Sequence, residues 1–245
     1  MIGMVLAAGA GRRLRPYTDT LPKTLVPVDG ERTVLDTALE NFAAAGLTDV
    51  AIVTGYCAQA IEDRVPALEQ THGLTIETVF NDKAEEWNNA YSLWCARSLF
   101  KEGVILCNGD TIAPLSVTTT LLEAAGTGSD LVLALDDHKV LTDESMKATV
   151  DATGQLQKLT KLMPNEEGLG EYIGLTLIEP IAHEIVADAL HQVWNDDPQL
   201  YYEDGFAELA RRGGRVTTAS IGAVEWTEVD DHKDLERARE IACRS

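Results

Sequence analysis

The chain has 245 residues, of which 45% are hydrophobic and 24% are charged, and its formal net charge is −20 at pH 7. A chain of this length and composition can bury one full core, so we expect a single soluble domain over residues 1–245. The negative charge disfavours nucleic acid and anionic membrane surfaces as partners, because both repel an acidic protein.

The first half of the chain alternates short apolar strands with helical patterns. The expected strands are Met1–Ala7, Asp49–Thr54, Leu74–Phe80 and Gly103–Cys107. The expected helices are Val34–Ala45, Cys57–Gln70 and Asn89–Phe100. This alternation predicts βαβ units, and hence a Rossmann-like α/β fold with three layers around a mixed, mostly parallel sheet. Ligands of such sheets bind at the carboxyl ends of the strands.

The second half combines further strands with helices, with no linker or repeat between the halves. The expected strands are Asp130–Leu135, Lys147–Val150, Gln155–Leu162, Glu171–Ile178, Val216–Ser220 and Val224–Glu228, the last two closing the sheet. The expected helices are Leu115–Ala125, Ile181–Leu190, Gly205–Arg212 and Asp231–Cys243.

Several features bear on the compartment. The apolar N-terminus lacks a basic leading segment and is too short for a signal peptide, and no apolar stretch reaches membrane-spanning length. The cysteines form no C-x-x-C pair and are expected to be reduced thiols. We therefore expect a cytoplasmic protein, and the sequence leaves both a monomer and a homodimer open.

A glycine-rich turn follows the first strand and leads into a basic patch. Gly9 and Gly11 allow a tight turn that aims several backbone N–H groups at one point, which is typical of an anion site. Leu14 stands where the dinucleotide fingerprint requires a third glycine, and no stretch matches a P-loop. The turn therefore belongs to neither of these phosphate loops.

The segment from Leu6 to Val28 reads L-A-A-G-x-G-x-R-L-x-P-x-T-x-x-x-P-K-x-L-x-P-V. It resembles the signature of the nucleotidyltransferases that join an NTP to a phosphorylated small molecule. The resemblance implies a catalytic Lys23 between the α-phosphate and the acceptor phosphate, and an Arg13 that holds the departing pyrophosphate. It also implies a nucleotide site lined by Leu6, Ala8, Gly9, Ala10 and Gly11. We expect Arg12 and Arg15 to be solvated.

The resemblance also implies a Mg²⁺ site. Asp110 follows an apolar strand in Asn108-Gly109-Asp110 and matches the aspartate that this family uses for metal. Asp230 is the match for a second aspartate, with Glu228 as a substitute ligand. The alternative for Asp110 is a helix N-cap, whereas Asp231 is the better candidate to cap the last helix.

Asn88-Asn89-Ala90-Tyr91-Ser92-Leu93 narrows the resemblance to bacterial CTP:phosphocholine cytidylyltransferases and the related phosphonate cytidylyltransferases. It implies that Asn88, Asn89 and Ser92 contact the base and ribose, since their side chains both donate and accept hydrogen bonds. Capping of a helix by either asparagine is the alternative, and one residue could do both.

The acceptor site is expected around a second set of residues. Met146-Lys147 resembles a Met-Lys pair of the same subfamily, which places Lys147 at the acceptor phosphate. Aromatic residues next to acids suit an ammonium group, by cation–π attraction and ion pairing. The residues concerned are Tyr172, Tyr202, Glu203 and Asp204. Ordinary packing with exposed acids is the alternative, and no complete aromatic cage for choline can be identified.

Together these resemblances imply a Mg²⁺-dependent cytidylyltransferase. It would transfer CMP from CTP to a small phosphorylated amino-alcohol or a small phosphonate and release pyrophosphate. A phosphate monoester is largely dianionic at neutral pH, so the attack needs positioning and charge neutralisation rather than a general base. A sugar-1-phosphate nucleotidyltransferase that uses another NTP and a non-catalytic nucleotide-binding subunit are the alternatives. The latter would be expected to have lost Lys23 or Asp110.

Overall fold

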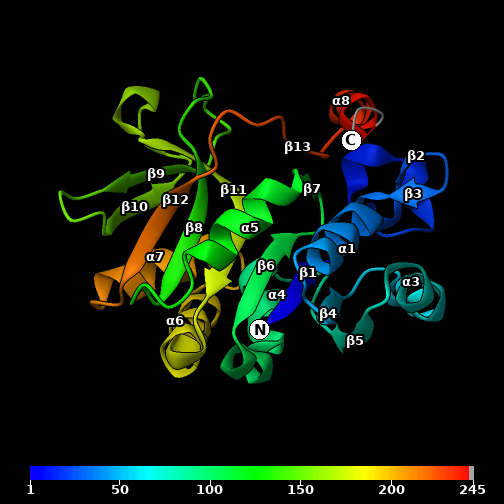
Figure 1. The fold of residues 1–245 in the computed structure, drawn as a ribbon, viewed down its shortest axis with the longest axis horizontal. Helices are drawn as coiled ribbons and strands as arrows, with labels where there is room; N and C mark the ends of the chain where they lie inside the picture. Colours follow the sequence, from blue (N-terminus) through cyan, green and yellow to red (C-terminus); the bar gives the residue numbers. More distant parts are fainter. Residues whose placement is uncertain (243–245) are drawn as a thin grey trace.

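A nine-stranded sheet runs through the molecule, whose computed structural model describes residues 1–242 (Figure 1). Seven strands follow one another in the order β10 (Leu156–Thr160), β9 (Lys147–Val150), β11 (Gly170–Ile178), β6 (Val104–Asn108), β1 (Ile2–Leu6), β4 (Asp49–Thr54) and β5 (Thr75–Phe80). β8 (Leu131–Asp136) pairs with β11 and with β12 (Val216–Ser220). All of these strands except β10 and β11 run in the same direction, so the sheet is mixed and mostly parallel, as expected.

Helices cover both faces of the sheet, because successive strand residues point to opposite sides. Val5 and Ile105 pack with the helices α1 (Val34–Ala44), α2 (Ala58–Glu62), α3 (Val65–His72) and α5 (Leu115–Glu123). Met4 and Leu106 pack with α4 (Asn89–Cys95), α6 (His183–Asp196) and α7 (Tyr202–Arg211) on the other face. Figure 1 shows α1 and α5 on the near side. The expected three layers are confirmed.

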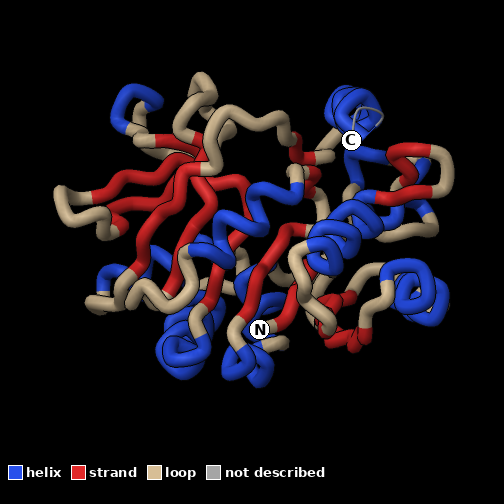
Figure 2. The backbone as a smooth tube through the Cα atoms, in the orientation of Figure 1, coloured by secondary structure: helices blue, strands red, loops and turns tan. Residues whose placement is uncertain are grey.

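A third apolar cluster lies beside the sheet, under the last helix. α8 (His232–Ala242) packs Leu235 and Ala238 against Leu14 and Val26 of the signature segment. The β2–β3 hairpin (Pro27–Asp29 and Arg32–Thr33) lies next to α8, as Figure 2 shows. The C-terminal helix therefore supports the signature segment.

Several expected elements differ from the structure. The helix expected at Cys57–Gln70 is two helices, because Pro66 is accommodated only in the first turn of a new helix, α3. The helix expected from Asn89 ends as an α-helix at Cys95 and continues as the 3₁₀-helix Arg97–Glu102. α7 begins at Tyr202, three residues before the expected start. Cys243, the expected end of the last helix, lies outside the described residues.

The prediction that the last expected strand, Val224–Glu228, closes the main sheet was wrong. β13 (Thr227–Glu228) does not close the main sheet but pairs with β7 (Thr111–Ile112), immediately after Asp110. Both edges of β6 are already occupied, by β1 and β11. β13 therefore crosses the carboxyl edge of the sheet and brings residues 228–230 to the turn at Asp110.

None of the helices within residues 1–242 combines the length and the apolar character that crossing a bilayer requires.

Candidate active site

Lys23 joins the two predicted metal ligands at the carboxyl edge of the sheet. Its Nζ atom donates hydrogen bonds to Asp110 Oδ2 at 2.8 Å and to Asp230 Oδ1 at 2.5 Å. The Lys23 side chain is only 13% exposed. Asp110 comes from the turn after β6, Asp230 follows β13, and Lys23 begins the 3₁₀-helix Lys23–Leu25. Residues that are 87 and 207 positions apart from Lys23 thus meet at one point.

The charges of this cluster control its protonation. Burial by itself lowers the pKa of Lys23, but the charges of Asp110 and Asp230 outweigh it, so the pKa of Lys23 is raised. Burial likewise opposes ionisation of Asp230, but Lys23 and Arg13 lower its pKa. At neutral pH the ammonium and the Asp230 carboxylate are therefore both charged.

Gly11 allows the signature turn to pass close to Lys23. Its φ is 57°, in the left-handed region, and a Cβ atom placed there would lie 2.8 Å from Lys23 Cβ. Thr18 Oγ1 donates to Gly11 O at 2.8 Å, and Tyr56 Oη donates to Thr18 O at 2.9 Å. The turn is thereby fixed against the loop after β4.

The signature arginines differ in their contacts. Arg13 Nη2 lies 3.0 Å from Asp230 Oδ2, although the Arg13 side chain is 70% exposed. Arg15 pairs with Asp19 on the surface, and Arg12 is exposed, as expected for solvated side chains. Only Arg13 of the three reaches the Lys23 cluster through a described ion pair.

A cavity of about 230 Å³ opens beside Asp110. Its lining brings together six of the predicted nucleotide residues and one predicted metal ligand, Asp110. The six are Leu6, Ala8, Gly9, Asn88, Asn89 and Ser92, and Trp87, Asn108 and Gly109 line the cavity with them. Ala10 and Gly11 lie in the turn next to it and are not among its lining residues. The β1, β6 and α4 segments thus form one pocket, and Trp87 and Asn108 are lining residues that the motif reasoning missed.

The polar residues of α4 are both structural and accessible from this cavity. Asn88 caps α4, because its Oδ1 accepts from Asn89 N at 2.8 Å. Asn89 Oδ1 accepts from Tyr202 N at 2.9 Å, and Ser92 Oγ accepts from Asn81 Nδ2 at 2.8 Å. The two alternatives for Asn88, a cap and a pocket residue, are therefore compatible.

The predicted acceptor tyrosines lie in the core. Tyr172 is 2% exposed and Tyr202 is fully buried. Tyr202 Oη donates to Asn108 Oδ1 at 2.8 Å, and Tyr172 Oη lies 3.1 Å from Tyr202 Oη. In this geometry the two tyrosines orient the side-chain amide of Asn108, and Asn108 lines the cavity. Direct contact with an acceptor stays a prediction.

The other predicted acceptor residues are also held by the protein. Lys147 is fully buried, and its Nζ donates to the carbonyl oxygens of Thr142 and Ser145, at 2.9 and 3.3 Å. Asp204 Oδ2 accepts from Tyr201 N at 2.8 Å at the start of α7. Glu203 is buried with no hydrogen-bond partner for Oε2, and burial raises its pKa to about 7. Sequence patterns could not distinguish such packing from ligand contact.

A second group of charged residues adjoins the Lys23 cluster. Burial, with the charges of Asp110, Asp230 and Glu171, raises the pKa of Glu228 to about 8. Lys139 pairs with Glu171 and lies over the Trp226 ring. Of these residues, only Glu228 was named from the sequence as a candidate, as a substitute metal ligand. The signal that could have found the group is position, because β8 ends at Asp136 on this same edge of the sheet.

Asp110 and Asp230 fit a Mg²⁺ ion. Asp110 Oδ1 is buried without a hydrogen-bond partner, and the Lys23 ammonium already places a cation between the two carboxylates. Within residues 1–242 no three His, Cys, Asp or Glu side chains form a metal-binding group by themselves. Mg²⁺ usually takes one or two carboxylates and completes its shell with water and substrate phosphates.

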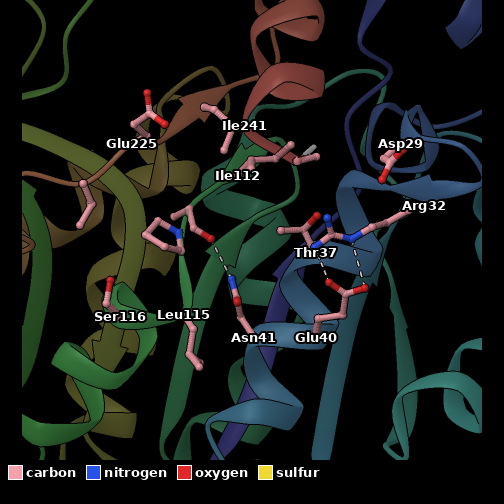
Figure 3. A pocket seen from close by; sticks show the side chains of 14 residues that line it. Asp29, Arg32, Thr37, Glu40, Asn41, Ile112, Leu115, Ser116, Glu225 and Ile241 are labelled. Atoms are coloured by element: carbon pink, nitrogen blue, oxygen red, sulfur yellow. Dashed lines mark hydrogen bonds and ion pairs between the residues drawn. The ribbon is translucent and has the colours of Figure 1, made fainter. Parts of the chain in front are cut away.

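The largest described cavity lies elsewhere. About 750 Å³ in volume, it is bordered by α1, β7, α5 and α8 (Figure 3). Arg32 and Glu40 pair within it, and Asn41 Nδ2 donates to Ala113 O at 2.9 Å. None of its described lining residues belongs to the signature segment Leu6–Val28. The smaller cavity is the better candidate because the signature, the paired carboxylates and the shifted pKa values meet there.

Comparison with known proteins agrees with this geometry. A family model described as nucleotidyl transferase matches residues 2–143. That match covers more than half of the chain, and the chain belongs to this family.

Two curated relatives show which kinds of transferase this chain resembles in sequence. A choline-phosphate cytidylyltransferase of Streptococcus pneumoniae is 35% identical over 97 residues, which is 40% of this chain and 39% of the relative. A CMP-5'-(3-aminopropyl)phosphonate synthase of Streptomyces rubellomurinus is 28% identical over 255 residues, covering 96% of this chain and 38% of the relative. The matched regions thus span about two fifths of the length of these relatives.

Solved structures confirm the fold. The inositol-1-phosphate CTP transferase from T. maritima superimposes with a TM-score of 0.84 at 20% identity, covering 99% of this chain and 94% of that chain. The α/β/α architecture is therefore shared along the described chain.

Proposed function

We propose that this protein is a Mg²⁺-dependent cytidylyltransferase. It transfers CMP from CTP to a small molecule that carries a phosphate or phosphonate, and it releases pyrophosphate. The observation that carries the proposal is the meeting of Lys23 and Asp230 with Asp110, which lines the cavity together with Asn88, Asn89 and Ser92. A cation between two carboxylates beside a cavity lined by polar side chains suits a reaction between phosphates.

The chemistry is an in-line displacement. An oxygen of the acceptor's phosphate or phosphonate forms a bond to the α-phosphorus, and the bond from the α-phosphorus to the bridging oxygen of pyrophosphate breaks. The Lys23 ammonium neutralises charge that builds up on the α-phosphate oxygens, and Arg13 binds the departing pyrophosphate. When bound by Asp110 and Asp230, Mg²⁺ supplies further positive charge to the phosphate oxygens.

The choice of CTP rests on two kinds of support. The first support is the names of the two relatives, which refer to choline phosphate and to an aminopropyl phosphonate. Both names also refer to a cytidylyl or CMP group, which CTP supplies. The Asn-Asn-x-Tyr-Ser-Leu stretch places amide and hydroxyl groups at the cavity, where they can read a base edge.

A pyrophosphate-release screen tests this proposal. Four NTPs with Mg²⁺ are combined with phosphocholine, phosphoethanolamine, 3-aminopropylphosphonate, an inositol phosphate and glucose-1-phosphate. We expect CTP with an amine-bearing acceptor to give the highest kcat/KM. A preference for glucose-1-phosphate with another NTP would move the protein to the sugar-nucleotide class, and release with no pair would contradict a catalytic role.

Two variants test the named residues. Lys23→Ala and Asp110→Asn should each lower kcat/KM by about 10²- to 10³-fold, as loss of a preorganised charge does elsewhere. Arg12→Ala is the matched control, because Arg12 is exposed in the same segment. Circular dichroism and thermal unfolding establish that each variant folds. Near wild-type turnover in a folded Lys23→Ala variant would contradict the mechanism.

A further inference from the structure

A lysine ammonium lies on an aromatic face beside a buried carboxylate, next to the proposed reaction site. Lys139 Nζ is 2.7 Å from Glu171 Oε2 and 4.6 Å from the centroid of the Trp226 ring. The Glu171 side chain is 9% exposed, whereas that of Lys139 is 40% exposed. An aromatic face with a carboxylate is a general way for a protein to bind an ammonium group.

The ring and the carboxylate are held independently of the Lys139 side chain. Trp226 Nε1 donates to Asp136 Oδ2 at 2.6 Å, and Ser145 Oγ donates to Glu171 Oε2 at 2.9 Å. Asp136 Oδ1 accepts from the backbone N–H of Lys139 at 3.0 Å, so the base of the lysine is fixed as well. Only the long, half-exposed stem of Lys139 is free to turn outward, and lysine stems have many rotamers. The receiving surface is therefore preformed.

This surface adjoins the Lys23 cluster. Trp226 immediately precedes β13, whose Glu228 lies opposite Thr111 in the pairing with β7. Thr111 Oγ1 donates to the carbonyl oxygen of Ile173, two residues after Glu171 in β11. An acceptor whose phosphate reaches Lys23 would thus point its other end along Glu228 toward Glu171 and Trp226.

We propose that Trp226 and Glu171 form the subsite for a positively charged amine or ammonium group of the acceptor, and that Lys139 occupies this subsite until the acceptor displaces it. This proposal rests on the proposed function and deepens it by naming the class of acceptor. Lys139 is then an internal competitor, and its release to solvent accompanies acceptor binding.

The arrangement discriminates against neutral acceptors. A cationic acceptor replaces the ion pair of Glu171, whereas a neutral acceptor that displaces Lys139 leaves a buried carboxylate without a cation. Binding the phosphate end of the acceptor here is disfavoured, because the Lys139 ammonium pairs with Glu171 and acts on the charge of Asp136, so a phosphate in its place would face carboxylates.

Matched ligands and variants test the subsite. Phosphocholine is compared with 3,3-dimethylbutyl phosphate, a neutral molecule of the same shape, and tetramethylammonium serves as the cation without a phosphate. Binding is measured by calorimetry and by the indole N–H signal of Trp226, assigned with Trp226→Phe. The variants are Lys139→Ala, Lys139→Arg, which keeps the charge, and Glu171→Gln. Lys158→Ala removes an exposed lysine on β10 as the control.

We expect Lys139→Ala to tighten the binding of phosphocholine and tetramethylammonium about fivefold, because an ion pair whose lysine is 40% exposed competes only weakly. Lys139→Arg and Lys158→Ala should stay within about twofold of the wild type. The wild type should prefer phosphocholine to its neutral analogue by about tenfold, and Glu171→Gln should remove most of that preference. The KM for CTP should not change in Lys139→Ala.

Two results would overturn the subsite. Weaker phosphocholine binding by Lys139→Ala would make Lys139 itself a contact of the acceptor, and equal binding of the neutral analogue would remove the need for an ammonium group. The two proposals fail separately. Tetramethylammonium binding at Trp226 without turnover of any NTP would contradict the transferase alone. Turnover of neutral acceptors without tetramethylammonium binding would contradict the subsite alone.

Discussion

Glu203 offers a quantitative test of the structure through the pH dependence of stability. Its carboxyl group is buried at the start of α7, and Oε2 has no hydrogen-bond partner. Burial, reinforced by the charge of Asp204, raises its pKa from 4.5 to about 7. The folded protein therefore keeps a proton on Glu203 over a range where the unfolded chain has lost it.

The sign and size follow from proton linkage. Below pH 4.5 both states are protonated, and the group contributes no pH dependence. As the pH rises to about 7, the folded state binds more protons, so the free energy of unfolding falls. The difference between the two pKa values corresponds to about 3 kcal/mol, fully lost above the folded pKa. Glu203→Gln carries no charge at any of these pH values and removes this loss.

Urea unfolding of wild type and Glu203→Gln at pH 4 to 8 measures the effect. The stability of Glu203→Gln relative to the wild type should rise by about 3 kcal/mol between pH 4 and pH 8. Glu184→Gln is the control, because the Glu184 side chain is 85% exposed on α6. Parallel curves for wild type and Glu203→Gln would refute the reasoning. A raised acceptor KM in Glu203→Gln would support the predicted acceptor contact.

Two further substitutions test the scaffold of the site. Tyr202→Phe removes the hydroxyl that donates to Asn108 Oδ1, so it should cost about 1–2 kcal/mol of stability and raise the KM for the NTP severalfold. Tyr17→Phe is the control, because the Tyr17 ring is exposed, and it should change neither quantity. An unchanged KM in Tyr202→Phe would show that Asn108 takes no part in nucleotide binding. Gly11→Ala forces alanine into the left-handed region against Lys23 Cβ, so urea unfolding should record a loss of at least about 1 kcal/mol. Gly9→Ala meets no atom within 4 Å and should leave stability nearly unchanged, so equal losses in both variants would contradict this account of the turn.

Local patterns predicted much of this molecule. The hydrophobic periods that predicted β1, β4, β6, α1 and α5 are local properties of the chain. The structure confirms these elements, and their ends differ from the predicted ends by no more than two residues. The start of α7 was missed by three residues, because the Tyr201 N–H to Asp204 bond that begins the helix is a side-chain contact without a periodic signal. Asp231 as the cap of α8 is confirmed, since its Oδ1 accepts from Lys233 N and Asp234 N.

The sequence by itself indicated the family and the strand-turn-helix order, because motifs and short-range spacing are written along the chain. Its resemblance to that family pointed to Lys23, Asp110 and Asp230 as site residues. The tertiary structure decided which of these residues meet. It paired β13 with β7 rather than with the main sheet, placed Tyr172 and Tyr202 in the core behind Asn108, and set Lys139 on Trp226 beside Glu171. Such contacts join residues far apart in the chain, and they depend on how the helices and strands pack, which no local period encodes.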